Sequence, residues 1–266
     1  EFLDPHCMRY DNRLNTTPDL REYPQMLDVH AKCSRFPPEH VYGLVSWKFE
    51  QKALITPSKF MQFVRFNPHN DFWVINPCFI LESVVANPWE QGEWHHPGIT
   101  QLARDVMIKS GQYKPKPNDN DFGMSIYPKE HMFFCNFFAG NKKFWDRLFN
   151  FTEHFYMTVE KNPDFKRRMM AASGYASDPN MSHFIFLFER LVPTFLEYNP
   201  DIRVAKYEYA YDEVAYKVSH TEYEYIQTLM KMKEILRKHP SVLLSDAYKK
   251  MRYAFMVDYP NSIHKE

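Results

Sequence analysis

Short apolar runs closed off by turn-forming residues constrain the fold of this chain most strongly. Phe72 to Ile75 (FWVI) is followed directly by Asn76-Pro77, and Met132 to Phe138 (MFFCNFF) is a second such run. A third, Val41 to Trp47, has the same character. Runs of this length are typical of strands buried on both faces. The sequence therefore predicts a sheet built from interior strands.

Helical spacing of apolar residues fills the stretches between these runs. We expect Thr17 to cap a helix with Pro18 and Asp19 in its first turn, and Thr56-Pro57 to open another. We expect helices over 20–32, 57–66, 99–110 and 141–159, and a final pair of helices in 221–253 broken at His239-Pro240. In the apolar run 184–196 we expect Pro193 to kink or start a helix. Strands alternating with helices predict an α/β fold with a mixed, mostly parallel central sheet flanked by helices.

Composition narrows the class of protein. Lys plus Arg equals Asp plus Glu at 33 each, so no net field favours nucleic acid as a partner. The four cysteines are widely spaced, which is typical of free thiols in a reducing compartment. No apolar run approaches the roughly 20 residues of a membrane-spanning helix. We expect a cytoplasmic protein, with peripheral association at the inner face of the membrane left open.

One stretch of twelve residues, Asn87 to Gly98, concentrates side chains that suit a polar site with an aromatic floor. Its functional side chains are Trp89, Glu90, Glu93, Trp94, His95 and His96. Carboxylates and histidines move protons near neutral pH, and tryptophan faces stack on sugar rings. The alternative is a surface loop whose tryptophans merely anchor it to the core.

Polar residues next to predicted strands are further candidates, because ligands of open α/β sheets gather beyond the carboxyl ends of the strands. Lys48 and Lys52 could meet a phosphate or simply be solvated at a helix start. Asn76 follows the FWVI run, and Asn136 lies within the MFFCNFF run. Arg190 could reach donor phosphates or form a buried structural pair with Glu189.

Several common chemistries lack their motif. The sequence contains no P-loop, no G-x-G-x-x-G and no G-x-S-x-G, which argues against ordinary nucleotide triphosphatases, Rossmann dehydrogenases and serine hydrolases. His95 and His96 are adjacent and would diverge on either a strand or a helix, so they do not suit a single metal ion.

Four segments together resemble bacterial glycosyltransferases of the GT-A-like kind encoded in capsule and lipopolysaccharide clusters. These segments are YGLVSWKFEQK, NPHNDFWVINP, NPWEQGEWHHPGI and FIFLFERLVPTFL, within about residues 10 to 200. The resemblance implies a GT-A-like nucleotide-sugar-binding and catalytic domain over 1–205, with a helical C-terminal extension over 206–266. It also implies a nucleotide-sugar donor lying over the strand ends. The chain departs from the family where Asn76 stands in place of an expected Asp-x-Asp motif.

The interpretation assigns roles to the candidate residues. Glu93 is the expected base, with Glu90 as its rival, and His95 or His96 orients the carboxylate or contacts the diphosphate. Trp89 and Trp94 floor the sugar. Donor-binding roles fall to Lys48, Lys52, Asn76, Asn136 and Arg190, and Asp71 is the candidate ligand for a divalent metal, Mn or Mg.

The expected function is transfer of a sugar from a nucleotide sugar to a glycan or lipid-linked acceptor in surface polysaccharide synthesis. Two alternatives stay open. One is a non-catalytic carbohydrate-binding or scaffold domain that uses the same tryptophans, and the other is a metal-dependent enzyme that uses Glu93, His95 and His96.

Overall fold

The computed structural model describes residues 7–13, 15–17, 20, 22–46, 48–114, 122–173 and 181–260. Within them lies a four-stranded sheet surrounded by helices, which confirms the α/β class. The strands are β1 (Tyr42–Gly43), β2 (Phe72–Ile75), β3 (Phe138–Gly140) and β4 (Val204–Tyr207). Their order across the sheet is β1-β3-β2-β4.

The prediction of a mostly parallel sheet is wrong. β3 pairs antiparallel with both β1 and β2, and only β2 and β4 run parallel. A short apolar run signals burial, but strand direction depends on how the intervening chain returns to the sheet. Only a small part of two predicted runs lies in a strand. The run from Met132 to Phe138 contributes its last residue to β3, and the run from Val41 to Trp47 contributes two residues to β1.

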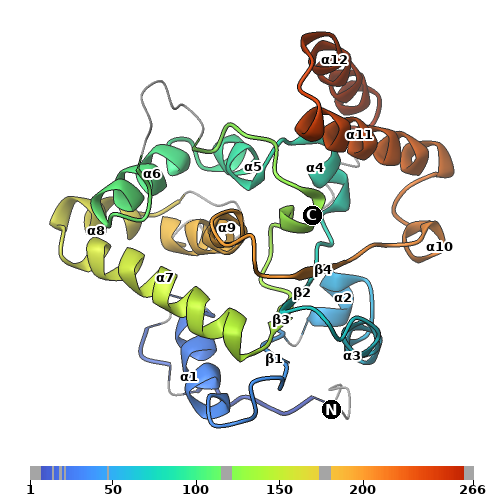
Figure 1. The fold of residues 1–266 in the computed structure, drawn as a ribbon. Helices are drawn as coiled ribbons and strands as arrows, with labels where there is room; N and C mark the ends of the chain where they lie inside the picture. The colour runs from blue at the N-terminus through green and yellow to red at the C-terminus, as the bar shows by residue number, and fades with distance from the viewer. Residues whose placement is uncertain are drawn as a thin grey trace.

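Helices account for most of the described chain. They are α1 (Tyr23–Cys33), α2 (Phe49–Ala53), α3 (Pro57–Phe66), α4 (Phe79–Val84), α5 (Pro88–His95), α6 (Ile99–Lys109), the 3-10 helix η2 (Lys129–His131), α7 (Lys142–Glu160), α8 (Pro163–Met169), α9 (His183–Glu197), α10 (Tyr211–Val214), α11 (His220–Lys238) and α12 (Val242–Asp258). Figure 1 shows α7 and α9 on one side of the sheet, α2 and α3 on the other, and the α11–α12 hairpin at the upper right.

Local capping explains why most helix predictions are confirmed. Thr56 accepts a hydrogen bond from the Lys59 amide at 3.1 Å at the start of α3, and Asn141 does the same for Phe144 in α7. The break between α11 and α12 falls at His239-Pro240 as predicted. α1 begins at Tyr23, and the predicted start at Pro18 and Asp19 lies outside the described residues.

The stretch from Asn87 to Gly98 is mainly helix α5 rather than a loop. The side chain of Asn87 accepts hydrogen bonds from the amides of Trp89 and Glu90, both at 2.9 Å, and Pro88 occupies the first helical turn. An Asn cap followed by Pro is a strong helix start. Because the stretch is helical, only side chains three or four residues apart lie on the same face.

The core is aromatic and centres on β2, whose four residues are all buried. Phe72 stacks on Phe144 of α7 with ring centroids 4.3 Å apart, and Phe144 meets Phe195 of α9 edge-on. α9 passes through this core with nearly every residue buried. Aromatic burial of this extent is the main stabilising term of the fold.

The C-terminal helices pack on the body through α11 and α12, both of which contact α4. The predicted boundary between residues 205 and 206 falls inside β4, because Ala205 and Lys206 both pair with β2. No helix in the described ranges combines the length and the apolar character needed to cross a membrane.

Candidate functional site

The edge of the sheet beyond the carboxyl ends of β2 and β4 gathers polar side chains from distant parts of the chain. Asn76 follows β2 there, and β4 brings Lys206 alongside because it runs parallel. β3 runs the other way, so the residues that precede it arrive at the same edge. The Ile75 amide donates to the Phe137 carbonyl at 3.0 Å, and the Cys135 thiol donates to the Ile75 carbonyl at 3.3 Å. We call this the carboxyl edge.

Four of its buried residues form a bonded set, the edge cluster: Asn76, Glu82, Lys206 and Lys233. The Glu82 carboxylate accepts from the Asn76 amide at 2.9 Å and forms an ion pair with Lys206. The Lys233 ammonium donates to the Glu82 backbone carbonyl at 2.6 Å. Such burial of charge is tolerated only where partners are close. The cluster thereby ties β2, α4, β4 and α11 together.

Lys233 is the most perturbed base of this cluster. Burial lowers the pKa of its ammonium to about 7, although the nearby carboxylate of Glu82 acts in the opposite direction. A lysine shifted this far can lose its proton near neutral pH. Its donation to a backbone carbonyl can be made in either protonation state.

Asn136 stands out at the same edge because its amide oxygen is buried and accepts no hydrogen bond from any described atom. A buried carbonyl without a donor is costly, so such a group calls for an explanation. The simplest one is a donor that a ligand supplies.

The neighbouring Cys135 is not an activated nucleophile. Burial raises the pKa of its thiol to about 12, with Glu189 adding to the rise while Lys206 and Lys52 oppose it. Reactive thiols need the opposite shift. Glu189 lies on α9 and Lys52 lies on α2, so charges from two further helices influence the pKa of this thiol.

Two of the five predicted donor-binding residues, Asn76 and Asn136, thus lie at this edge. Helix α2, which carries Lys52, packs next to it through Phe49, whose ring centroid is 5.4 Å from that of Phe137. Lys52 is exposed, as is Lys48 one helical turn earlier, whose carbonyl accepts from the Lys52 amide at 3.0 Å. The edge therefore combines exposed ammonium groups with an unpartnered amide oxygen.

Arg190, the fifth predicted donor-binding residue, lies buried between α9 and α5. Its guanidinium donates to the Pro88 carbonyl at 3.0 Å, to the Phe186 carbonyl and to the Gln91 side chain. Gly92 permits this approach, since a Cβ there would lie 2.4 Å from the Arg190 Nε. Arg190 thus fastens α9 to α5 through these three acceptors.

The residues of the Asn87 to Gly98 motif point in different directions, because successive helical residues are turned by about 100°. Trp89 is fully buried and donates through its indole nitrogen to the Thr194 hydroxyl at 3.0 Å, so its ring offers no free face to a sugar. Glu90 accepts from the Ala86 amide at 2.6 Å and pairs with Arg252 of α12 at 2.8 Å. Trp94 and His95 are exposed.

Glu93 caps the next helix. Its carboxylate accepts from the Gly98 amide at 2.8 Å and from the Thr100 amide at 2.7 Å, at the start of α6. Partial burial acts to raise the pKa of Glu93, but these hydrogen bonds outweigh it and the pKa is lowered. A carboxylate held in this way is a weaker base than a free one.

His96 is buried and stacks on Phe186, with ring centroids 3.8 Å apart. Burial, reinforced by Arg190 and His183, lowers its pKa to about 4. The imidazole is therefore neutral at physiological pH and packs as an aromatic ring.

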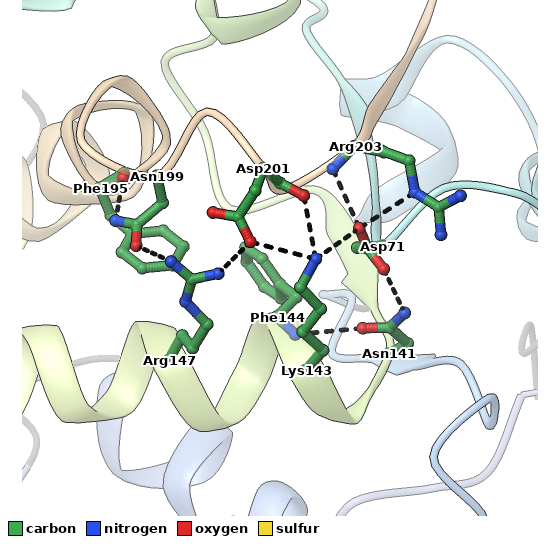
Figure 2. A network of polar contacts seen from close by, with 9 residues as sticks. All are labelled: Asp71, Asn141, Lys143, Phe144, Arg147, Phe195, Asn199, Asp201 and Arg203. Carbon is green, nitrogen blue, oxygen red and sulfur yellow. Dashed lines mark hydrogen bonds and ion pairs between the residues drawn. The ribbon is translucent and has the colours of Figure 1, made fainter.

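Asp71 lies at the opposite, amino end of β2 (Figure 2). Its carboxylate accepts from the Asn141 amide at 2.9 Å, from the Arg203 amide at 3.0 Å and from the Lys143 ammonium at 3.3 Å. Burial acts to raise the pKa of Asp71, yet these donors outweigh it and set the pKa at about 2. In the part of the chain that the structure describes, no three His, Cys, Asp or Glu side chains are grouped to hold a metal ion.

Sequence reasoning missed three members of the edge cluster: Glu82, Lys206 and Lys233. A signal for two of them is present, because Glu82 is a lone charge in the apolar stretch FILESVV and Lys206 lies in the strand VAKY. A charge in such a run must find a partner. Lys233 carries no comparable signal, since α11 is rich in lysine.

Comparison of the chain with protein-family models, with curated proteins and with solved structures gave no match.

Proposed function

We propose that this protein is a glycosyltransferase that takes a sugar from a nucleotide-sugar donor, and that the donor binds at the carboxyl edge of the sheet. The observation that carries the proposal is the Asn136 amide oxygen, which is buried at the carboxyl edge and accepts no hydrogen bond from the residues that the structure describes. Edges of this kind are where α/β proteins bind ligands. The sequence resemblance supplies the class of reaction.

In this proposal the residues of the edge divide the work. Asn136 accepts an N–H or O–H of the donor nucleotide or sugar, which satisfies its orphan oxygen. Lys52, with Lys48 one turn away, compensates the negative charge that develops on the departing diphosphate. Neither lysine is held inside the core, so both are accessible to a phosphate.

The base that activates the acceptor hydroxyl is assigned to Glu189 rather than Glu93. Glu189 is half-buried on α9 and its charge acts on Cys135 at the carboxyl edge. Glu93 already accepts two backbone hydrogen bonds that hold α6. The acceptor is a glycan or lipid-linked saccharide of surface polysaccharide synthesis, as the resemblance implies.

Donor binding is tested by thermal shift with UDP-, GDP- and CMP-linked sugars, since a ligand of the folded state raises its melting temperature. We expect one donor class to stabilise the wild type. Asn136→Ala should abolish the shift without lowering the melting temperature of the free protein, because it removes an unpartnered carbonyl. Lys52→Met should weaken the shift. Asn150→Ala and Lys109→Met, both at exposed helical positions, are matched controls.

Turnover is tested by release of nucleotide in the presence of acceptor saccharides. Glu189→Gln should retain the donor-induced shift in melting temperature and lose sugar transfer. Glu93→Gln should lower the melting temperature of the free protein and leave nucleotide release largely intact. Donor binding without release would favour the carbohydrate-binding alternative. A donor shift that survives Asn136→Ala unchanged would refute the proposed site.

A further inference from the structure

The outward face of α12 is an unusual surface for a helix, because large apolar side chains lie on it in solvent. Val242 and Leu243 are 81% and 82% exposed, and Tyr253 and Val257 are 70% and 57% exposed. Their spacing places all four within one side of the helix, opposite the buried Tyr248 and Phe255. The helix therefore has apolar side chains on two opposite sides. The body of the protein covers the side with Tyr248 and Phe255 and leaves the other side in solvent.

The same hairpin carries a local excess of positive charge. Two carboxylates, Glu234 and Asp246, lie in the stretch 231–250. Its exposed cations are Lys231, Arg237, Lys238, Lys249 and Lys250. Over both helices of the hairpin, residues 220–258, there are seven Lys and Arg and five Asp and Glu, so the excess is concentrated in the stretch 231–250. Asp246, Lys249 and Lys250 lie on the outward face itself, between its two pairs of apolar residues.

The hairpin is bonded to the body, and α12 lies on the side of α11 that is away from the sheet (Figure 1). The Tyr248 hydroxyl donates to the Ser83 carbonyl at 2.9 Å, and Lys233 of α11 is bonded to Glu82. Arg252 pairs with Glu90 at 2.8 Å. These contacts use the inner side of α12 and leave its outward face free.

Apolar side chains interspersed with lysines on one helical face suit the boundary between lipid headgroups and acyl chains. Each Lys or Arg near an anionic bilayer adds attraction, and the apolar side chains insert below the headgroups. We infer that the outward face of α12, with the α11–α12 turn, docks the protein on an anionic membrane surface.

This inference goes beyond the proposed function and stands on different residues. The donor is assigned to the carboxyl edge, whereas the docking surface is the outer face of the hairpin. Nucleotide release in solution and vesicle binding therefore succeed or fail separately.

The experiment is flotation of the full chain with phosphatidylcholine vesicles and with vesicles that also contain phosphatidylserine. We expect binding only to the anionic vesicles, and weaker binding at high salt because exposed charges are screened. Lys249→Gln with Lys250→Gln should lower the partition at least about tenfold, given the attraction that each lysine contributes. Val242→Ser with Leu243→Ser should lower it as well.

Matched controls carry the same changes elsewhere on the surface. Phe66→Ser removes an exposed aromatic residue of α3, and Lys109→Gln with Lys161→Gln removes two exposed lysines of α6 and the end of α7. Controls that bind like the wild type support the docking face. Equal binding to both vesicle types, no binding by the wild type, or self-association that Val242→Ser with Leu243→Ser abolishes would each overturn it.

Discussion

Asp71 keeps its negative charge inside the protein because it is surrounded by donors from α7 and from the start of β4. Asp71→Asn should therefore lower the free energy of unfolding at neutral pH by about 2 kcal/mol, the linkage value of its lowered pKa. That contribution is complete above the ordinary value of 3.8 and is lost as the pH falls through about 2. Urea unfolding of both proteins across this range measures it.

The control is Asp201→Asn, which alters an exposed carboxylate of the same network, paired with Arg147 (Figure 2). Exposed ion pairs contribute little, so its effect should be well below that of Asp71→Asn. Equal losses in the two variants would show that burial does not strengthen the Asp71 contacts.

His96 predicts a second loss of stability on acidification, in a higher pH range than that of Asp71. Its folded-state pKa of about 4 lies below the ordinary 6.5, so the unfolded chain binds a proton that the folded chain refuses. Stability should fall as the pH drops from 6.5 to about 4, and His96→Gln should remove up to about 3 kcal/mol of that fall. Denaturant titrations at both ends of the range test this, with the exposed His95→Gln as control. A wild type that loses no stability over this range would contradict the assignment.

The sequence alone indicates which residues could take part in a site, but it does not indicate which contacts those residues make. Asn76 and Asn136 were marked because they border or interrupt short apolar runs, and both lie at the carboxyl edge. Trp89 and Glu93 were marked by chemistry alone. Their actual contacts, a core hydroxyl and the amides of α6, depend on which face of α5 turns inward and on Gly98 having no side chain to cap α6.

At the scale of elements, the packing of α5 on α9 depends on Gly92. Gly92→Ala improves helix propensity, yet its Cβ would lie 2.4 Å from the Arg190 Nε and would displace a guanidinium with three bonded acceptors. We expect a net loss of about 1–3 kcal/mol in the free energy of unfolding. Thermal and urea unfolding measure it.

Gly98→Ala provides the contrast, because that position has open space but a φ of 88°. It should cost only the left-handed backbone strain, about 1–2 kcal/mol. An unchanged free energy of unfolding in Gly92→Ala would mean that the Arg190 guanidinium can move away from the new Cβ without losing stabilising contacts.

Element boundaries were predictable where the signals are local. Thr56-Pro57, Asn141 and His239-Pro240 mark a helix start, a second start and a break, and each acts on its own few residues. Strand direction was not predictable in this way. It follows from long connections, and the apolar runs that mark β2 and β3 read alike in either direction.

For the whole molecule, the C-terminal segment is bonded into the body through β4, Lys206 and Lys233. A chain ending at residue 205 would lose half of β4 together with Lys206 and Lys233, and would leave the buried Glu82 without either lysine. We expect that fragment to show no cooperative thermal transition by circular dichroism. A chain ending at Lys238 keeps these groups and should retain a transition at reduced temperature. Cooperative unfolding of the shorter fragment would support two independent units.

The pairing of β2 with β4 also has a consequence for synthesis on the ribosome. Asp71 and Arg203, which flank this pair, are 132 residues apart, so β2 emerges long before its parallel neighbour. During that interval one side of a wholly apolar strand has unpaired amides and carbonyls, which is the condition that invites edge-to-edge aggregation. Nascent chains arrested before β4 should consequently be clients of chaperones that shield strand edges.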